Sequence, residues 1–267
     1  MIDGVVTDTA RVKACCATAY ESGFARLLLG DSFHPGGLEL TERLGRLLKL
    51  GPPDHVLDVA AGKGESAIFL ARTFGCSVTG IDLSAANAAE ATSRAAAAGV
   101  ADRVSFVQDD AERLSFPDGA FDALLCECAF CTFPDKPAAA AEFHRVLRPG
   151  GRAGLSDLTR DGPLPQELES LLAWIACIAD ARSVAEYAAY LESAGFRGAV
   201  IEQHDQALRQ MVRDVEGRLL GAELMTKLKK LDVAGADFEQ AKSLARAASA
   251  AVRAGLLGYA VITAGRS

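Results

Sequence analysis

The chain alternates short apolar segments with segments of helical periodicity from His55 to Leu158. The apolar segments are predicted to be β-strands, and this alternation is typical of a parallel sheet with helices on both faces. The predicted strands are HVLDVA (55–60), SVTGID (77–82), RVSFVQ (103–108), FDALLCE (121–127) and RAGLSDL (152–158). The predicted helices between them are ESAIFLARTF (65–74), AANAAEATSRAAAAG (85–99) and KPAAAAEFHRVL (136–147). The order of elements therefore places the fold in the α/β class.

The pattern changes on both sides of this alternating region. Residues 1–45 are predicted to form one or two helices, broken by a loop at GDSFHPGG (30–37) that is rich in glycine. Beyond residue 162 the predicted elements are helices over 163–180 and 184–196, a strand over 199–205, a mostly helical region over 206–254 and a strand over 255–265. A chain of 267 residues, 50% of them hydrophobic, suits one compact domain with an elaboration, or at most two small domains.

Composition excludes several classes of partner. The formal net charge is −7 and no basic stripe is present, which argues against a nucleic-acid partner. No apolar run reaches the roughly 20 residues that a membrane span requires, and the first residues lack the order of a signal peptide. We therefore predict a soluble, cytoplasmic protein acting on a small molecule, whose seven cysteines are thiols. The sequence yields no prediction of oligomeric state.

The segment VLDVAAGKGES (56–66) combines an acidic residue near the end of a strand with a glycine turn that opens a helix. Glycines allow a ligand to approach the backbone closely, and a helix N-terminus offers unpaired N–H groups. Asp82 ends the next strand, 18 residues after Gly64, where an acid can accept both hydroxyls of a ribose. A dinucleotide site is disfavoured because the third glycine of G-x-G-x-x-G is missing.

The order Asp58, Ala60, Gly62, Gly64 resembles the nucleotide-binding motif of class I S-adenosylmethionine-dependent methyltransferases. Two further segments extend the resemblance over residues 50–160: VQDDAERLSFPDGAFD (107–122) resembles the third motif, and EFHRVLRPGG (142–151) resembles the helix and turn that follow a strand. The family usually has glycine where this chain has Ala60, and alanine is expected to be tolerated there if its φ is negative.

This resemblance implies an S-adenosylmethionine cofactor and a Rossmann-like sheet of seven strands. It implies that Asp110 bonds the adenine amino group and that the backbone of Ala111 bonds the ring edge. The full set of expected cofactor-binding residues is Asp58, Ala60, Gly62, Gly64, Asp82, Leu83, Asp110, Ala111 and Glu127. The chain is accordingly interpreted as a single methyltransferase domain, 1–267, divided into an N-terminal helical cap (1–50), a cofactor-binding core (51–205), a helical insertion or lid (206–254) and the last strand (255–267).

Three cysteines fall within CECAFC (126–131), at the carboxyl end of the fourth predicted strand. In open α/β sheets ligands bind at that edge, so the segment borders the place where a methyl group would be delivered. Cys126 and Cys128 share one face if the strand persists, with Glu127 on the other. Spacing alone fits buried cysteines of a core about as well as a zinc site. Zinc would require a fourth ligand, and the nearest histidine, His144, lies on a separate helix.

A more specific resemblance is to the arsenite methyltransferase family. It rests on ECAFCTFPDKPAAAAEFHRVLRPGG (127–151), followed by LSDL and by a predicted helix with Trp174 and Cys177. Cys128, Cys177 and Cys15 match cysteines that hold trivalent arsenic in that family. The resemblance therefore implies that Cys128 and Cys177 bind arsenic as a substrate, that Cys15 supplies a third sulfur, and that the protein serves arsenic detoxification.

Helical periodicity is compatible with this interpretation. Cys177 lies opposite the apolar stripe of the helix predicted over 164–180. Cys15 lies just outside the apolar stripe of an N-terminal helix. By contrast, Cys16 and Cys76 are expected in the core. Thiolates prefer soft partners. Arsenic keeps a lone pair for attack on the methyl group, so no general base is required.

One departure from the arsenite family leaves the acceptor open. Asp31 stands where the family has a further cysteine, which implies fewer methylations, another entry thiol (Cys16, Cys126 or Cys131) or another substrate. The alternative is a methyltransferase for a small organic thiol, hydroxyl or carbon acid, with His34 or Glu127 orienting or deprotonating the acceptor. A third hypothesis is a binding protein that senses metalloid or thiol state.

Overall fold

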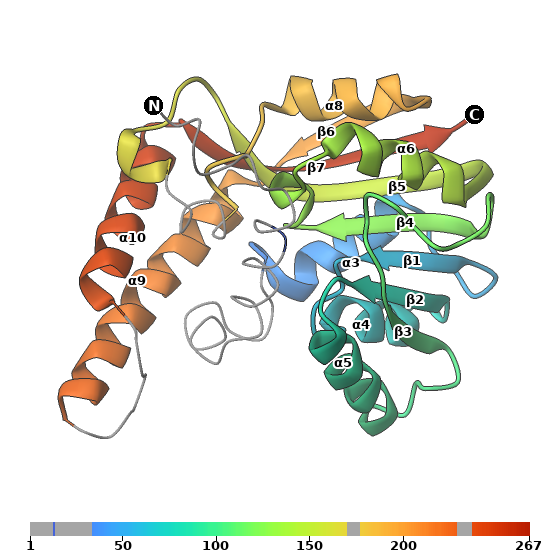
Figure 1. Ribbon diagram of the computed structural model, residues 1–267, viewed down its shortest axis with the longest axis horizontal. Coiled ribbons are helices and arrows are strands. Elements are labelled where there is room, and N and C mark those ends of the chain that lie inside the picture. The colour runs from blue at the N-terminus through green and yellow to red at the C-terminus, as the bar shows by residue number, and fades with distance from the viewer. Residues whose placement is uncertain (1–12, 14–33, 170–176, 229–236) are drawn as a thin grey trace.

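The computed structural model describes residue 13 and residues 34–169, 177–228 and 237–267. Within these residues a seven-stranded sheet has the order β3-β2-β1-β4-β5-β7-β6 (Figure 1). The strands are β1 (His55–Val59), β2 (Ser77–Asp82), β3 (Val104–Gln108), β4 (Phe121–Glu127), β5 (Leu147–Arg160), β6 (Phe196–Gln203) and β7 (Leu257–Arg266). The five strands predicted between His55 and Leu158 are confirmed, with β5 longer at both ends than expected.

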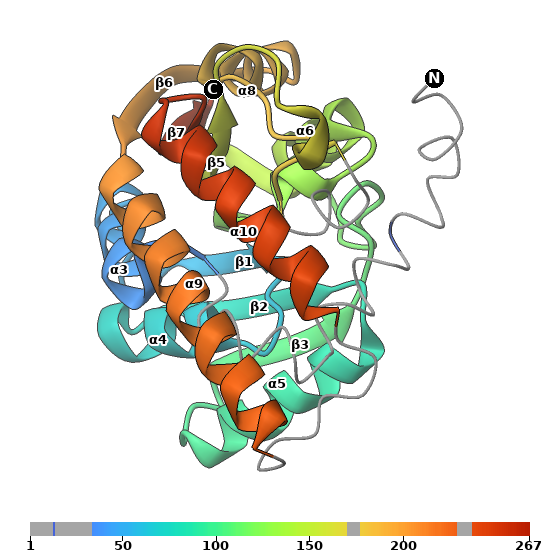
Figure 2. The same ribbon diagram turned by 90° about the vertical axis from the view of Figure 1, so that its left-hand side faces the viewer.

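The last strand makes the sheet mixed. Strands β1 to β5 pair in parallel, whereas β7 is antiparallel to both β5 and β6. Helices α9 (Asp205–Lys227) and α10 (Phe238–Arg253) follow β6 and lie on the side where the parallel strands end (Figures 1 and 2). The chain re-enters the sheet from that side, so β7 runs in the opposite direction.

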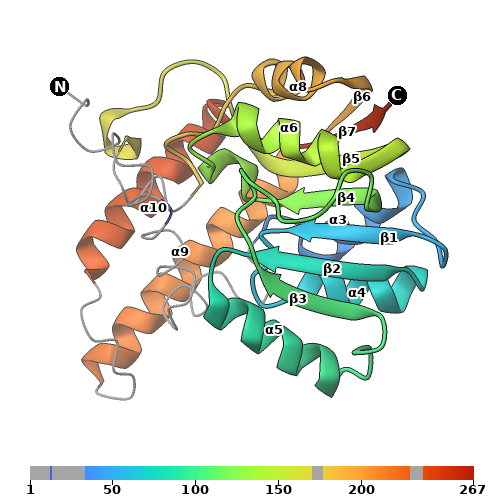
Figure 3. The ribbon, with the colours of Figure 1, turned by 45° about the vertical axis from the view of Figure 1, so that its right-hand side comes forward.

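Helices cover both faces of the sheet, as the alternation predicts. The remaining α-helices of the described residues are α3 (Gly37–Leu47), α4 (Glu65–Phe74), α5 (Ala85–Ala97), α6 (Lys136–Val146) and α8 (Val184–Ser193). Helices α6 and α8 pack together on one face, and α3 and α4 pack together on the other (Figure 3). The centres of β1, β2, β4, β5 and β7 are buried between these layers, whereas β3 and β6 are largely exposed. Cys76 is fully buried, which confirms it as a core residue.

Local sequence signals fix where several helices begin. The hydroxyl of Ser84 accepts a hydrogen bond from the N–H of Asn87 at the start of α5. The carboxylate of Asp135 does the same for Ala138 at the start of α6. These side chains satisfy N–H groups that a helix leaves unpaired in its first turn. The starts of these two helices therefore depend on contacts between residues three positions apart.

The predicted helix over 163–180 is wrong at both of its described ends. The first part contains only a short 3₁₀ helix, Gln166–Leu168, after two prolines. At the other end Cys177 has φ 64°, in the left-handed region, and lies in a turn. Cys177 was expected away from the main core face, yet its exposed fraction is only 3%. Tertiary contacts described below hold this turn in place and override its helical periodicity.

The helical region predicted over 206–254 is confirmed where it is described, as α9 and α10. Both helices lie beside the carboxyl ends of the parallel strands, where a lid would have to be, and that role stays a prediction (Figure 2). Of the predicted N-terminal cap, the structure describes residue 13 and residues 34–50, which include the end of the loop and α3. Among the described helices, none combines the length and apolar character needed to cross a membrane.

Candidate active site

The glycine turn between β1 and α4 adopts left-handed backbone conformations at Ala60 (φ 57°), Gly62 (φ 54°) and Gly64 (φ 79°). A side chain at Gly64 would lie 2.5 Å from the Phe106 ring, so only glycine fits there. A Cβ at Gly62 would meet nothing within 4 Å, which leaves the backbone at this point open to a ligand. The shape of the turn therefore allows a ligand to approach its backbone closely.

The condition under which alanine was expected to be tolerated at Ala60, a negative φ, is not met. The N–H of the next residue, Ala61, donates to the carbonyl of Ile81 on β2 at 2.8 Å, and this bond holds the left-handed turn. Alanine in this conformation carries about 1–2 kcal/mol of strain that glycine avoids.

We expect Ala60→Gly to raise the free energy of unfolding by about 0.5–1 kcal/mol, because relief of that strain exceeds the added freedom of the unfolded chain. Urea denaturation measures the change. The matched control is Ala61→Gly, whose backbone has no such strain, and which should lower stability. A loss of stability in Ala60→Gly equal to that of the control would contradict the strain.

Asp82 joins the glycine turn to the start of α5. Its carboxylate accepts hydrogen bonds from the N–H of Gly62 (2.9 Å), the N–H of Ser84 (2.8 Å) and the side-chain amide of Asn87 (3.3 Å). The carbonyl of the adjoining Leu83 accepts from the Gln108 amide at 3.0 Å. The structure thus brings Asp82 and Leu83 to the turn, as the predicted cofactor site requires.

Two buried carboxylates lie at the same edge of the sheet. Asp58 is 2% exposed, and its Oδ2 has no hydrogen-bond partner within the described residues. Burial, followed by the nearby charges of Glu127 and Asp82, raises the pKa of Asp58 well above its ordinary value, although the N–H of Ala67 donates to it. A buried carboxylate oxygen without a partner is unfavourable unless a ligand satisfies it.

Glu127 ends β4 and is held by neutral donors from two helices. The hydroxyl of Ser66 donates to it at 2.6 Å, and that of Thr41 at 3.1 and 3.2 Å. The His34 Nε2 lies 3.6 Å from Glu127 Oε2 and 3.4 Å from the Thr41 hydroxyl, and His34 is 8% exposed. His34, on the loop before α3, is thereby placed against the carboxyl end of β4.

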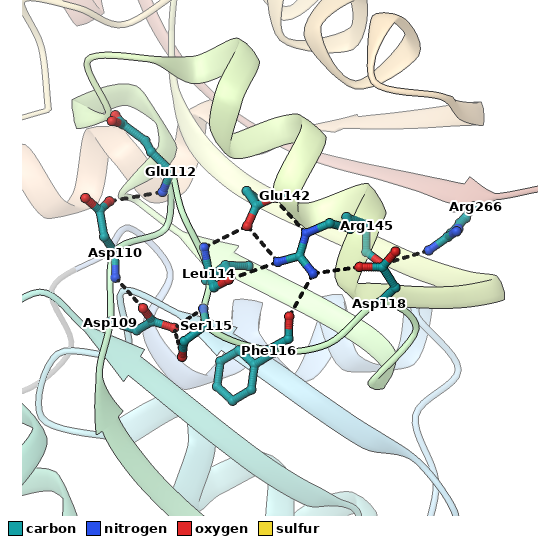
Figure 4. A network of polar contacts seen from close by, with 10 residues as sticks. All are labelled: Asp109, Asp110, Glu112, Leu114, Ser115, Phe116, Asp118, Glu142, Arg145 and Arg266. Carbon is teal, nitrogen blue, oxygen red and sulfur yellow. Dashed lines mark hydrogen bonds and ion pairs between the residues drawn. The ribbon is translucent and has the colours of Figure 1, made fainter.

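The loop that carries Asp110 is fixed by the next motif along the chain, on α6. Arg145 donates to the carbonyls of Leu114 and Phe116 at 2.9 and 2.7 Å, and Glu142 accepts from the N–H of Leu114 at 2.7 Å (Figure 4). These bonds hold residues 109–118 in the bend that presents Asp110 and the buried Ala111. The third motif and the end of α6 thus form one structural unit.

Lys13, which was not predicted to belong to the site, contacts this loop. Its ammonium forms ion pairs with Asp110 at 2.8 Å and with Glu112 at 2.5 Å. Burial opposes the charge of Lys13, but hydrogen bonds to both carboxylates outweigh it and raise the pKa of Lys13. The lysine is 97 positions from Asp110, and no local signal in the sequence connects the two. Of the other N-terminal predictions, Cys15, Cys16 and Asp31 lie outside the described residues, as does Trp174.

Cys128 and Cys177 meet although 49 positions separate them. The Cys177 thiol donates to the carbonyl of Cys128 at 3.2 Å and also contacts the thiols of Cys128 and Cys131. Strand β4 ends at Glu127, and Cys128 has φ 51°, so the expected sharing of one strand face by Cys126 and Cys128 does not occur. Cys126 is fully buried in the core instead.

The thiols lie in a buried environment. Contact with Cys177 and burial raise the pKa of the Cys128 thiol, and burial followed by contact with Cys177 raises that of Cys131. Asp157, at the end of β5, accepts from the N–H of Cys131 at 2.9 Å, and burial raises the pKa of this carboxyl to about 7. The same described residues include no group of three or more histidine, cysteine or acidic side chains arranged to hold a metal ion.

A buried ion pair holds the two cysteine segments together. Lys136, 2% exposed, pairs with Asp180 and donates to the carbonyls of Cys131 and Phe133 at 2.8 and 3.1 Å. Asp180 follows the Cys177 turn, and it also pairs with Arg182. Lys136 and Asp157 were not predicted as site residues, although both lie inside segments that carry the family resemblance. The residues next to them in the sequence do not indicate that they are buried.

The strand order, the glycine turn and the acidic residue at the end of β2 define a Rossmann-like, nucleotide-cofactor-binding protein. A family model described as a methyltransferase domain matches residues 56–151. O-methyltransferase cnsE of Penicillium expansum is 33% identical over 238 residues, which cover 86% of this chain and 78% of the relative. The chain belongs to the class I S-adenosylmethionine-dependent methyltransferases, and its cofactor is S-adenosylmethionine.

Other relatives are longer than the matched region. The 27-O-demethylrifamycin SV methyltransferase of Amycolatopsis mediterranei is 36% identical over 174 residues, 64% of each chain. Methyltransferase GfsG of Streptomyces halstedii is 33% identical over 168 residues, so the match spans 60% of that relative. The chain thus covers less than two thirds of these two curated relatives.

Solved structures agree on the fold. Phosphoethanolamine N-methyltransferase 2 of Haemonchus contortus, in complex with S-adenosylhomocysteine, superposes with a TM-score of 0.77 at 19% identity. The superposition covers 94% of this chain and 58% of the chain of that structure. Geranyl diphosphate C-methyltransferase of Streptomyces coelicolor A3(2) gives 0.72 at 20% identity, covering 96% and 98%. The predicted Rossmann-like methyltransferase sheet is confirmed.

Proposed function

We propose that this protein transfers a methyl group from S-adenosylmethionine to a hydroxyl of a small organic acceptor bound at the carboxyl end of β4. The observation that carries this proposal is the buried pair of His34 and Glu127 at that edge, with 3.6 Å between Nε2 and Oε2. Support also comes from the relatives, whose names include an O-methyltransferase and a methyltransferase of 27-O-demethylrifamycin SV.

The roles of the two residues follow from the chemistry of a hydroxyl acceptor. S-adenosylmethionine supplies an electrophilic methyl group. The acceptor oxygen must lose its proton as the new carbon–oxygen bond forms, and a positioned imidazole is the commonest side chain to take it. His34 accepts that proton, and Glu127 stabilises the positive charge that the imidazole gains. Bonds from Ser66 and Thr41 fix Glu127 for this purpose.

The proposed cofactor contacts start from the fit of the glycine turn. The open side of Gly62 leaves room for a ligand there, and the Oδ2 of Asp58, which has no hydrogen-bond partner among the described residues, offers an acceptor. Asp82 would hold the ribose hydroxyls, and Asp110 with Ala111 would hold the adenine.

Asp82→Ala is expected to weaken S-adenosylmethionine binding by about 1.5–3 kcal/mol, because the contact is between a charged acceptor and hydroxyl donors. Titration calorimetry measures the affinity. Since Asp82 also holds Gly62, thermal unfolding is recorded in parallel. Unchanged affinity in a folded variant would remove Asp82 from the site.

The acceptor class is tested by product analysis. Wild-type protein is incubated with methyl-labelled S-adenosylmethionine and a panel of small hydroxyls, amines, thiols, carbon acids and trivalent arsenic. Labelled product from hydroxyls is expected. Label transferred to amines or carbon acids alone would reject the hydroxyl proposal, while leaving the methyltransferase class intact.

Trivalent arsenic is the second candidate acceptor, favoured by one observation: the Cys177 thiol lies against Cys128 at the edge where the methyl group would arrive. Arsenic binds thiolates, and the carboxylate of Asp157 lies beside the cluster, where it accepts from the N–H of Cys131. Cys15, as a third sulfur, remains a prediction.

If arsenic is the acceptor, Cys128→Ser and Cys177→Ser should each abolish its methylation, because each removes one soft ligand, while S-adenosylmethionine still binds. Cys76→Ser, in the core, serves as the control and should keep activity. Label incorporation into arsenic reports the result. Full arsenic methylation by both serine variants would reject the thiol clamp, and none by the wild type would reject arsenic itself.

A further inference from the structure

The loop after β3 carries three acidic residues within four positions, Asp109, Asp110 and Glu112. The carboxylate of Asp109 accepts from two N–H groups and one hydroxyl, all of them neutral donors. Asp110 accepts from the N–H of Glu112 at 3.0 Å. The cation that pairs with both Asp110 and Glu112 within the described ranges is Lys13, 97 positions before Asp110. A distant part of the chain therefore supplies the charge partner of this loop.

Lys13 fixes the orientation of the Asp110 carboxylate. Its ammonium donates to both oxygens, at 3.0 Å to Oδ1 and 2.8 Å to Oδ2, and pairs with Glu112 at 2.5 Å. An ammonium has three N–H donors, so these contacts engage all of them and leave none for a ligand. The Asp110 side chain is still 38% exposed and has acceptor capacity left, so Asp110 can receive a donor from a ligand while Lys13 holds it.

Contacts with β2 place Asp110 beside the proposed cofactor site. Gln108 pairs with Asp82 in the register of β3 and β2, and the N–H of Asp109 donates to the carbonyl of Asp82 at 3.1 Å. Asp110 is the next residue along the chain, and Asp82 is the acid proposed to hold the ribose to which the adenine is attached. Asp110 is thus within the region where the base of the cofactor is expected.

A carboxylate at this place can distinguish one base from another. Adenine carries an amino group, a donor, where hypoxanthine carries a carbonyl oxygen, an acceptor. A carboxylate accepts a hydrogen bond from the amino group and repels the oxygen. The distinction is sharper when the carboxylate is held in one orientation before the ligand binds, because the ligand then does not have to order it.

We propose that Lys13 is a positioning residue for cofactor recognition, which holds the Asp110 carboxylate in the orientation that favours an adenine base. Lys13 itself touches neither cofactor nor acceptor, and its effect passes through Asp110. This inference rests on the proposed contact between Asp110 and the adenine amino group, and it is independent of the acceptor.

The test compares S-adenosylhomocysteine, the product of methyl transfer, with S-inosylhomocysteine, in which hypoxanthine replaces adenine. Titration calorimetry gives both dissociation constants for the wild type and for Lys13→Met. We expect the ratio of the inosyl constant to the adenosyl constant to fall about fivefold, because the charge-assisted contact to adenine loses its fixed geometry. Lys13→Arg keeps the positive charge and should retain most of the ratio. An unchanged ratio in Lys13→Met, or equal weakening of both ligands, would overturn the proposal.

Asp110→Asn separates this proposal from the adenine contact on which it rests. Alone it should lower the ratio, and adding Lys13→Met to it should produce no further fall. An unchanged ratio in Asp110→Asn would reject the adenine contact and this proposal with it. A lowered ratio there, with an unchanged ratio in Lys13→Met, would reject only the role of Lys13. A further fall in the double variant, as large as that of Lys13→Met alone, would assign the effect to the pair with Glu112 and overturn the proposal.

Lys242→Met on α10 is the matched control. The Lys242 ammonium also pairs with two carboxylates, Glu223 at 2.9 Å and Glu239 at 2.6 Å, and its side chain is 19% exposed, against 18% for Lys13. Its ratio should equal that of the wild type. A ratio that falls as far as in Lys13→Met would assign the effect to net charge and reject the proposal. Should thermal unfolding show that Lys13→Met is not folded, Lys13→Gln carries the same test.

Discussion

Lys136→Met is expected to lower the free energy of unfolding by about 3 kcal/mol, at the lower end of the range for breaking a buried ion pair. The substitution removes the ammonium from Asp180 and leaves the carbonyls of Cys131 and Phe133 without their donor. Arg182 still pairs with Asp180, which limits the loss. Urea denaturation, with stability extrapolated to water, measures the change.

The matched control is Lys227→Met on α9. Its ammonium pairs with Glu223 at 2.6 Å, four positions away, but the lysine side chain is 70% exposed. Exposed pairs contribute little, so we expect a change within about 0.5 kcal/mol. Similar losses in both variants would show that burial of Lys136 has no special weight in stability.

His34→Ala is expected to lower kcat for a hydroxyl acceptor by about 10²–10⁴-fold, the usual contribution of a general base. The reason is that His34 is the proposed proton acceptor and Glu127 its charged partner, 3.6 Å away. Steady-state kinetics with an acceptor from the product panel gives kcat. Calorimetry should give an S-adenosylmethionine affinity close to that of the wild type.

His55→Gln provides the comparison at the opposite edge of the sheet. His55 begins β1, and its Nε2 is 2.9 Å from the Thr79 hydroxyl, a contact that glutamine can replace. This variant should keep its kcat. Full activity in His34→Ala would show that another group at this edge accepts the proton, and Glu127 would be examined first.

The cofactor half of the site followed from the sequence because its parts are close along the chain. The turn after β1, the acid after β2 and the loop after β3 each follow a strand, and parallel strands bring such points to one edge. Hydrogen bonds from Gly62 to Asp82 show the first two parts meeting. The roles of these residues toward S-adenosylmethionine remain proposals.

The acceptor half was harder to predict because it depends on contacts between distant segments. Periodicity placed Cys177 on a helix and away from the core, whereas it lies in a buried turn against Cys128. The interpretation of the cysteines as an arsenic site came from a family resemblance, and the comparisons extend only to the methyltransferase class.

By itself the sequence determined the order of the strands and helices between His55 and Leu158 and the place of the glycine turn, because hydrophobic periodicity and backbone preference act over a few residues. Only the tertiary structure decided the left-handed backbone at Ala60, the meeting of Cys128 with Cys177 and the pairing of Lys136 with Asp180. It also left Asp58 buried without a basic partner among the described residues. Burial and long-range electrostatics set these features, and neither is encoded in the spacing of nearby residues.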